Sequence, residues 1–186
     1  MPPKTKITKE KIIEAAIKTV RESGADALNA RALAAALQCS TQPIFSNFSS
    51  MEEVRRSVIE ESEKLYEAMI RRETESGKYP PYKASGMAYI RFASEEKELF
   101  KLLYMRDRTK EVIPEKTDLT DRMTKTVSEN TGLNATEAEL FHLEMWAYVH
   151  GIAVITATEY LTLPEELISK MLTDAYEGLK SRFHKE

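Results

Sequence analysis

The sequence predicts an all-α protein, and three observations lead to this fold class. Apolar residues recur with a period near 3.6 along the chain, and no run alternates apolar and polar residues as a strand would. Hydrophobic residues make up 42% and charged residues 31% of the 186 positions, with only 6 Gly and 7 Pro. This composition excludes collagen-like and largely disordered chains. We therefore expect a soluble protein built from packed helices.

The first two expected helices are short and have N-cap residues. The first begins after Thr8 and ends at Gly24, which fits a C-terminal glycine. Its apolar stripe consists of Ile13, Ala16, Ile17 and Val20. The second spans residues 30–37 and begins after Asn29. Its stripe consists of Leu33, Ala34 and Leu37.

A third short helix and a fourth long one follow. Ser40 is the expected N-cap of the third, and Pro43 fits its first turn, where a missing N–H costs nothing. Ile44 and Phe48 form its buried pair. The fourth helix starts with a capping box of Ser50 and Glu53 and runs to about Thr74. Its expected apolar positions are Val54, Val58, Leu65 and Met69.

The stretch 77–81 holds one Gly and two Pro residues, so we place the main boundary there. The predicted domains are residues 1–49, a connecting helix over 50–74, and a second domain over 75–186. Helices are expected over 82–93, from Ser94 to a break at Pro114, and over 118–131. A capping box of Thr136 and Glu139 precedes the next helix, and Pro164 fits the first position of the last helix.

The charge is unevenly distributed. The chain as a whole carries −3, whereas residues 1–50 hold seven basic and four acidic side chains, a local charge of +3. A basic segment on an acidic body is expected where only that segment contacts a polyanion. The single cysteine, Cys39, cannot form an intrachain disulfide, and no stretch resembles a signal peptide, so we expect a cytoplasmic protein. The apolar stretch 145–157 is shorter than the ~20 residues of a membrane span, so no membrane contact is expected.

The first three helices form a predicted helix-turn-helix unit, whose third helix would lie in the major groove of DNA. Polar residues of that helix surround its buried pair. Gln and Asn can make two hydrogen bonds to adenine, one through the oxygen and one through the nitrogen of the side-chain amide. Ser and Thr can bond base edges or phosphates, and Phe can contact a thymine methyl. The outward residues are Thr41, Gln42, Phe45, Ser46 and Asn47. This set of side chains favours base recognition.

Residues 12–16, 22–24, 31–34 and 44–48, followed by Glu52 and Glu53, resemble the TetR family of transcriptional regulators in order and spacing. Trp146, followed by His150 and Gly151, is similar to the C-terminal domain of one TetR subgroup. The resemblance implies a TetR-like fold, in which a three-helix DNA-binding domain is joined to a helical domain for dimerisation and ligand binding.

The resemblance also implies the DNA-contacting positions. Phe45 stands where the family usually has Tyr, Met51 where it often has Lys, and Gln38 where it commonly has Gly. Two phosphate contacts are thereby lost, and we expect the N-terminal lysines Lys4, Lys6, Lys9 and Lys11 to offset them. The expected DNA-binding residues are Lys4, Lys6, Arg31, Ser40, Thr41, Gln42, Pro43, Phe45, Ser46, Asn47 and Ser50.

The last two helices predict a homodimer. Residues 145–157 are apolar on nearly every side, and a helix without a polar face must be covered all round. Two copies could cover these helices in a four-helix bundle, with Gly151 at a close approach, and would then bind a palindromic operator. The expected interface residues are Gly151, Ile152, Ile155, Ile168, Met171, Leu172, Ala175, Tyr176, Leu179 and Phe183. Packing within one subunit is the alternative for Met171, Tyr176 and Phe183.

By resemblance, the middle of the chain encloses a partly apolar small-molecule effector, whose entry would release a repressor from DNA. The expected pocket residues are Tyr89, Phe92, Phe100, Leu103, Tyr104, Trp146 and His150. Core packing is the alternative for each of them.

Two other functions stay open, a helical module that binds a protein partner and a helical metal enzyme. The second would use Glu139 and His142 as a Glu-x-x-His motif, but di-iron proteins need this motif on two helices and the chain has one. We expect no catalytic residue, no metal site and no cofactor.

Overall fold

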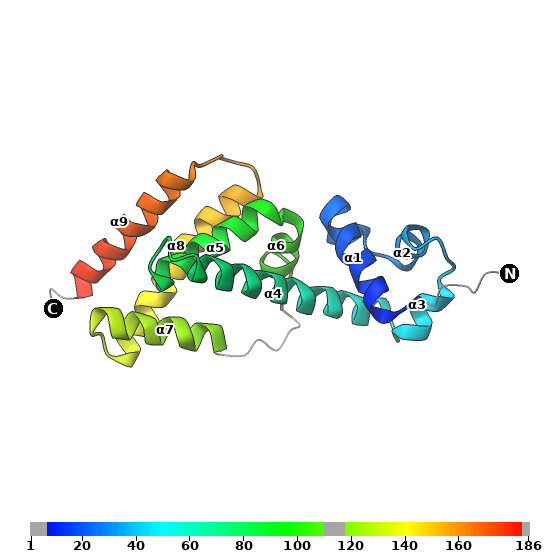
Figure 1. The fold of residues 1–186 in the computed structure, drawn as a ribbon, viewed down its shortest axis with the longest axis horizontal. Coiled ribbons are helices and arrows are strands. Elements are labelled where there is room, and N and C mark those ends of the chain that lie inside the picture. The colour runs from blue at the N-terminus through cyan, green and yellow to red at the C-terminus, as the bar shows by residue number, and fades with distance from the viewer. Residues whose placement is uncertain (1–6, 110–117, 184–186) are drawn as a thin grey trace. The chain divides into compact units, whose positions relative to one another are not determined.

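The computed structural model describes residues 7–109 and 118–183, and every regular element in these ranges is a helix (Figure 1). The all-α prediction is confirmed. The elements are α1 (Lys9–Ser23), a 3-10 turn η1 (Ala25–Ala27), α2 (Ala30–Ala36), α3 (Gln42–Asn47), α4 (Met51–Glu75), α5 (Pro81–Glu95), α6 (Lys97–Tyr104), α7 (Asp118–Thr131), α8 (Ala135–Ala157) and α9 (Glu165–Phe183). The predicted break at Pro114 lies outside the described residues.

The chain divides into two compact units that differ from the predicted domains. The first unit comprises Met1–Glu67 and Glu96–Arg106, and the second comprises Ala68–Glu95 and Asp107–Glu186. Helix α6 belongs to the first unit because it packs against α1 and η1. The sequence indicated this helix correctly but placed it in the second domain.

The core of the first unit joins α1, α2, α3 and the start of α4. Its buried side chains are Ile12, Ala16, Val20, Leu28, Leu33, Ala34, Ile44, Phe48, Val54 and Val58. In the predicted stripe of α1, Ala16 and Val20 are buried as expected, but Ile13 and Ile17 are half-buried and Ile12 is buried in their place. Spacings of three and four residues both keep side chains on one helix face, so the pattern allowed either choice.

Local capping signals in this unit were partly correct. Thr8 Oγ1 accepts the Lys11 N–H, and Asn29 Oδ1 accepts two N–H groups at the start of α2. Ser40 does not cap α3, since Thr41 occupies the N-cap position and makes no side-chain capping bond. Ser50 Oγ accepts the Glu53 N–H at 3.2 Å, but the Glu53 carboxylate accepts from Ser49 instead of from Ser50.

Helix α4 buries Val54 and Val58 as predicted, but beyond Val58 its buried positions differ from the predicted ones. Leu65 is exposed and Met69 half-buried, whereas Ser62 and Tyr66 are buried. Ser62 satisfies its hydroxyl by donating to the Val58 carbonyl at 2.7 Å. A polar side chain bonded within its own helix can face a core at little cost, so hydrophobicity alone gave the wrong stripe.

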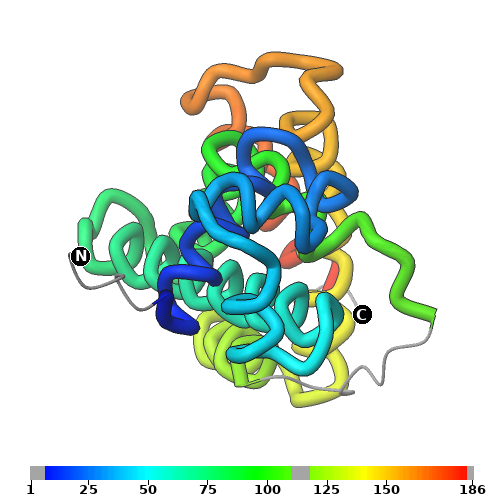
Figure 2. Tube along the Cα trace, turned by 90° about the vertical axis from the view of Figure 1, so that its right-hand side faces the viewer, coloured from blue at the N-terminus to red at the C-terminus, as the bar shows by residue number. Residues whose placement is uncertain are grey.

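The second unit is organised around α5 and α8, which pack along one another. Tyr82 is hydrogen-bonded to His142 Nδ1 at 3.0 Å and Tyr89 to His150 Nδ1 at 2.9 Å. Residue numbers rise together on both helices, so α5 and α8 run in the same direction. Helix α7 packs against α8, and the chain turns back after α8 into α9, as the orange segment of Figure 2 shows.

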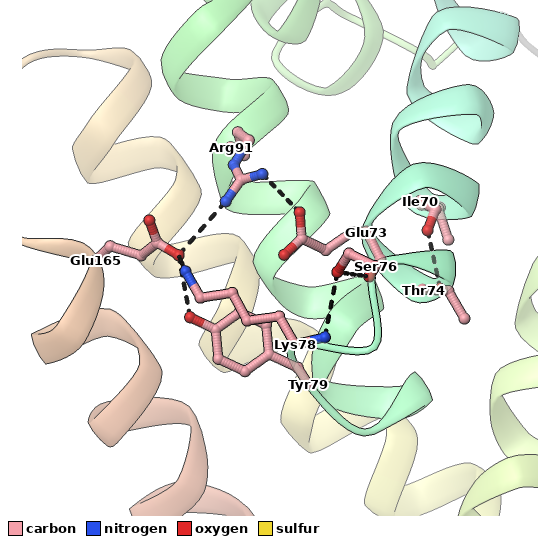
Figure 3. Close-up of polar contacts among 8 residues, drawn as sticks. All are labelled: Ile70, Glu73, Thr74, Ser76, Lys78, Tyr79, Arg91 and Glu165. Carbon is pink, nitrogen blue, oxygen red and sulfur yellow. Dashed lines mark hydrogen bonds and ion pairs between the residues drawn. The ribbon is translucent and has the colours of Figure 1, made fainter.

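Charged side chains join the end of α4 to the rest of the second unit, to which it belongs (Figure 3). The Glu73 side chain is only 5% exposed, and its carboxylate accepts a bond from Arg91 at 2.6 Å. Arg91 also reaches Glu165 at the start of α9 at 3.4 Å. Glu165 accepts from Lys78 and Tyr79 of the α4–α5 connection at 2.6 and 3.0 Å. These bonds join α4, α5 and α9.

Three start signals of the second half were misplaced. Ser94 lies inside α5, and α6 starts after Glu96. The capping box of α8 consists of Asn134 and Glu137 rather than Thr136 and Glu139. Pro164 precedes α9 and accepts the Ile168 N–H, so it occupies the N-cap position. Each difference is a few residues or less, as is usual for helix ends.

Helix α8 has 23 residues and is long and apolar enough to cross a membrane by length and composition alone. It is longer than the apolar stretch suggested. Its buried side chains nevertheless form part of a protein core, since Ala138, Phe141 and Met145 pack with Val127 and Leu133. The core helix of a globular unit explains these contacts.

The turn between α2 and α3 stores backbone strain at Gln38, which has φ +52°. A side chain in this left-handed region costs roughly 1–2 kcal/mol, which Gly avoids. We expect Gln38→Gly to raise the free energy of unfolding by about 0.5–1 kcal/mol in urea denaturation. Glu14→Gly, in the middle of α1, is the matched control and should lower it by about 1 kcal/mol. An equal loss in both variants would contradict the strain at Gln38.

Candidate nucleic-acid interface

Helix α3 separates an apolar face from a polar one within six residues. Ile44 and Phe48 are buried in the first unit, as predicted. Gln42, Phe45 and Ser46 are exposed. Because the two buried side chains fix the rotation of the helix, the exposed ones must face away from the core. Helix α3 therefore presents a defined outer face.

The exposed residues of α3 differ in how their side chains are held. The Gln42 residue is exposed, and its side-chain amide makes no hydrogen bond with another described residue. Ser46 Oγ donates to the Gln42 carbonyl at 2.9 Å, which leaves its acceptor lone pairs outward. The Phe45 side chain is 49% exposed, although it is large and apolar. A donor-acceptor amide beside an exposed aromatic ring suits contact with base edges and methyl groups.

Asn47 has a different environment from the one predicted. Its amide nitrogen donates to the Pro43 carbonyl at 2.8 Å and to the Ile7 carbonyl at 3.4 Å. Both amide hydrogens are therefore used within the protein, and a two-bond contact with adenine, which needs one amide N–H, would have to break one of these bonds. In this conformation Asn47 fastens the chain before α1 to the end of α3.

The other predicted DNA-binding residues flank α3. Arg31, Ser40 and Ser50 are exposed, and Thr41 and Pro43 are half-buried. Arg31 lies in the first turn of α2, where its backbone N–H is held by Asn29. Lys4 and Lys6 lie outside the described residues.

Lys9, one of the N-terminal lysines expected to offset the lost phosphate contacts, makes contacts within the protein that the sequence did not indicate. Its ammonium lies 4.7 Å from the centroid of the Phe48 ring and 3.3 Å from the Glu53 carboxylate. Hydrogen bonds from Ser49 hold the pKa of Glu53 below its usual value, so this carboxylate stays charged beside Lys9. Lys9 thus joins α1 to α3 and α4. A lysine at the start of an amphipathic helix gave no sequence signal for such a contact.

The seven predicted effector-binding residues fall into both units. Phe100, Leu103 and Tyr104 belong to the first, where Phe100 and Leu103 are buried. Tyr89, Phe92, Trp146 and His150 belong to the second. Trp146 is exposed and stacks on His150 with ring centroids 4.9 Å apart, while Tyr89 bonds the same His150. The second unit therefore brings Tyr89, Trp146 and His150 together.

Most predicted dimer residues are already covered within one chain. Ile152, Ile168 and Leu172 are buried. Four others pack against the core cluster around Phe141, namely Ala175, Tyr176, Leu179 and Phe183. Ile152, Ile168 and Leu172 therefore contribute to the core of their own chain, while the half-buried Ala175, Tyr176, Leu179 and Phe183 keep part of their surface exposed. Gly151 is exposed, and Ile155 and Met171 are half-buried.

Other apolar side chains of α8 and α9 are exposed instead. Leu140, Leu143 and Tyr148 lie on the outer side of α8, and Leu167 lies near the start of α9. Leu143 is 58% exposed, which is unusual for a leucine in a helix that also supplies a core. Gly151 is on the same side, and a Cβ added there would meet nothing within 4 Å. The apolar surface of α8 thus exceeds what one chain covers.

The Glu139 and His142 motif is not arranged as a metal site. His142 is bonded to Tyr82, and no group of three His, Cys, Asp or Glu residues in the described part of the chain could hold a metal ion. Burial lowers the pKa of His142 and of His150, so both rings favour the neutral state. Each histidine thus acts as a hydrogen-bonding partner between α5 and α8.

Comparisons with known proteins agree with this architecture. Residues 82–175 match the family model of the tetracyclin repressor-like C-terminal domain. A TetR-like transcriptional regulator from Rhodococcus sp. RHA1 is 14% identical, with a TM-score of 0.69 over 92% of this chain and 94% of that chain. A TetR family member from Streptomyces coelicolor A3 is also 14% identical, with a TM-score of 0.60 over 90% and 96%. No curated protein matches the sequence.

Helix α3 is short, has a polar outer face and is held by α1, α2 and α4, and a helical second unit follows it. This combination is typical of a helix-turn-helix transcriptional regulator. The family model covers half of the chain, including Trp146 and His150. The chain belongs to the tetracyclin repressor-like (TetR) family.

Burial lowers the pKa of His142 and of His150, which predicts a pH-dependent stability. A histidine whose folded-state pKa is lowered contributes full stability above its unfolded pKa, and this contribution is lost as the pH falls from that value through the lower folded-state pKa. We expect the melting temperature to decrease between about pH 7.5 and 5.5, and His142→Gln to reduce this decrease. Lys125→Gln on α7 is the control. An unchanged pH dependence in His142→Gln would show that His142 is not held neutral by the fold.

Proposed function

We propose that this chain is a cytoplasmic homodimeric repressor that binds a palindromic operator and is released from it by a partly apolar small molecule. The outer face of α3 is the observation that carries the proposal. Gln42 reads base edges, Phe45 packs against a thymine methyl or the sugar-phosphate backbone, and Ser46 accepts or donates at the groove. Arg31, Ser40 and Ser50 border this face and contact phosphates, and Thr41 and Pro43 lie at the groove.

The N-terminal lysines supply attraction that does not depend on sequence. Lys4 and Lys6 replace the phosphate contacts that Phe45 and Met51 do not make. Ile7 supports this role, since its carbonyl is bonded to Asn47 at the end of α3. The chain therefore enters α1 beside the proposed reading face.

The second copy covers the exposed apolar side of α8. Leu140, Leu143 and Tyr148 are exposed there, and Gly151 permits a close helix crossing. Leu167 and Met171 extend this surface on α9. A two-fold pair then requires two operator half-sites, related by a palindrome and about 34–36 Å apart or a multiple of this.

The effector site is assigned to the aromatic residues of the second unit. Tyr89, Trp146 and His150 combine apolar rings with polar atoms, as small-molecule sites do. A typical coupling between ligand and DNA of about 1–3 kcal/mol would change operator affinity by about 5- to 150-fold.

Selection of bound sequences from random duplex DNA tests the proposal directly. A palindrome supports it, whereas no enrichment favours a helical module that binds a protein partner. We expect Gln42→Ala to lose about 1–3 kcal/mol of binding free energy on the selected operator and to relax its preference at one base pair. Fluorescence anisotropy on the operator and on single-base variants measures both effects.

A second variant shows how loss of a phosphate contact differs. Lys4→Ala combined with Lys6→Ala should weaken binding to all sequences and reduce the slope of log affinity against log salt by about 0.9 for each contact. Gln42→Ala should leave this slope unchanged. If Gln42→Ala weakens all sequences equally, Gln42 contacts phosphate and not bases.

The dimer can be tested without DNA. Leu143→Glu places a charge in the proposed interface, so we expect a shift from dimer to monomer at micromolar concentration in sedimentation equilibrium. Lys125→Glu, on exposed α7, is the control and should remain dimeric. A dimer of unchanged affinity in Leu143→Glu would exclude this face of α8.

A further inference from the structure

An ion pair joins the end of α1 to the start of α6. Arg21 Nε donates to Glu96 Oε2 at 2.7 Å, and its Nη2 donates to Oε1 at 2.6 Å. The Glu96 side chain is only 20% exposed. Two parallel bonds in a partly desolvated site orient both helices more firmly than a surface pair with one bond.

The position of Glu96 indicates that its main role is to pair with Arg21. Glu96 occupies the N-cap position of α6 but makes no capping bond with its own helix. Its carboxylate is directed instead to Arg21 in the last turn of α1. An acid at a helix N-terminus and a base at a helix C-terminus are both favoured by the helix dipoles. Both charges therefore suit the helix ends that they join.

Further contacts keep α6 against the same unit. A Cβ at Gly24, just after α1, would lie 3.1 Å from Glu98 Oε2 of α6. The Tyr104 ring of α6 meets the edge of the Tyr66 ring of α4 at 6.4 Å. Leu99, Phe100, Leu102 and Leu103 of α6 are buried. The ion pair is thus one part of a continuous packing between α6, α1 and α4.

The opposite end of α1 holds α3. Lys9 lies over the Phe48 ring, and Asn47 bonds the Ile7 carbonyl. Twelve residue steps of α-helix separate Lys9 from Arg21, a rigid span of about 18 Å. A displacement at Arg21 is therefore transmitted along α1 to the end of α3.

We propose that α6 is a working part of the DNA-reading unit, and that Arg21 and Glu96 are positioning residues that set α1, and through α1 the outer face of α3. The inference rests on the proposed DNA binding of α3. It assigns to α6 a direct effect on operator affinity, which a helix that serves only ligand binding would not have.

Two other roles of the pair make different predictions. If the pair only stabilises the fold, its loss lowers the melting temperature and leaves operator affinity unchanged. If Arg21 contacts a phosphate, Arg21→Ala weakens binding and flattens the salt dependence, whereas Glu96→Ala strengthens binding because it removes a competing anion. A positioning role requires both single variants to weaken binding.

The experiment measures operator affinity of the full chain, at several salt concentrations, on the sequence obtained by selection. Arg21→Ala and Glu96→Ala should each lose roughly 2- to 30-fold in affinity with an unchanged salt slope, and their combination should lose no more than either alone. The exchanged pair, Arg21→Glu with Glu96→Arg, should recover only part of the affinity, because each charge then lies at the helix end that the dipole disfavours. Glu22→Ala is the control for Glu96→Ala. It also removes one negative charge, but from an exposed position of α1 next to Arg21.

Hydrogen exchange separates failure of this inference from failure of the proposed function. In both single variants, deuterium uptake over residues 42–54 should rise, although these residues do not touch the pair. If the wild-type protein enriches no sequence from random duplex DNA, the proposed function fails. Deuterium uptake in the two variants then still decides whether the pair of Arg21 and Glu96 positions α3. Unchanged uptake over these residues, or wild-type operator affinity in either variant, overturns the inference.

Discussion

Burial of Ile44 and Phe48 is the interaction on which the interface depends. Helix α3 has six residues, far fewer than the ~12–15 that an isolated helix needs to be even marginally stable in water. It exists because these two side chains pack into the core of the first unit. The same packing fixes its rotation and so decides that Gln42, Phe45 and Ser46 face outward. Recognition chemistry and core stability are therefore inseparable in this helix.

The helices around α3 share the work of holding it. Lys9 of α1 contacts Phe48 and Glu53, and Asn47 bonds the residue that precedes α1. At its other end, α1 is held by Glu96. The long helix α4 begins in the first unit and ends in the second, where buried Glu73 pairs with Arg91. Each unit therefore anchors its own part of α4.

The sequence predicted best those features that depend on neighbouring residues. Thr8, Asn29 and Gly24 were identified correctly because a cap or a left-handed glycine is determined within a few positions. The buried face of α4 was predicted at Val54 and Val58 but missed beyond them, because Ser62 is buried with its hydroxyl bonded internally. Tyr176 and Phe183 contact Phe141 within the chain, which the sequence could not indicate because apolarity shows that a side chain is covered and not which chain covers it. Helix α6 was placed in the second domain because no local pattern encodes its bond to Arg21.

The ion pair of Glu73 and Arg91 also restricts the order in which the two residues can be substituted in evolution. Arg91 is partly exposed and has a second acid, Glu165, within 3.4 Å, so a change at Glu73 leaves the guanidinium with another partner. A change at Arg91 first would strand a carboxylate in a desolvated position, which is the costlier step. Lineages that lose this pair should therefore pass through a neutral residue at position 73 before they replace the arginine.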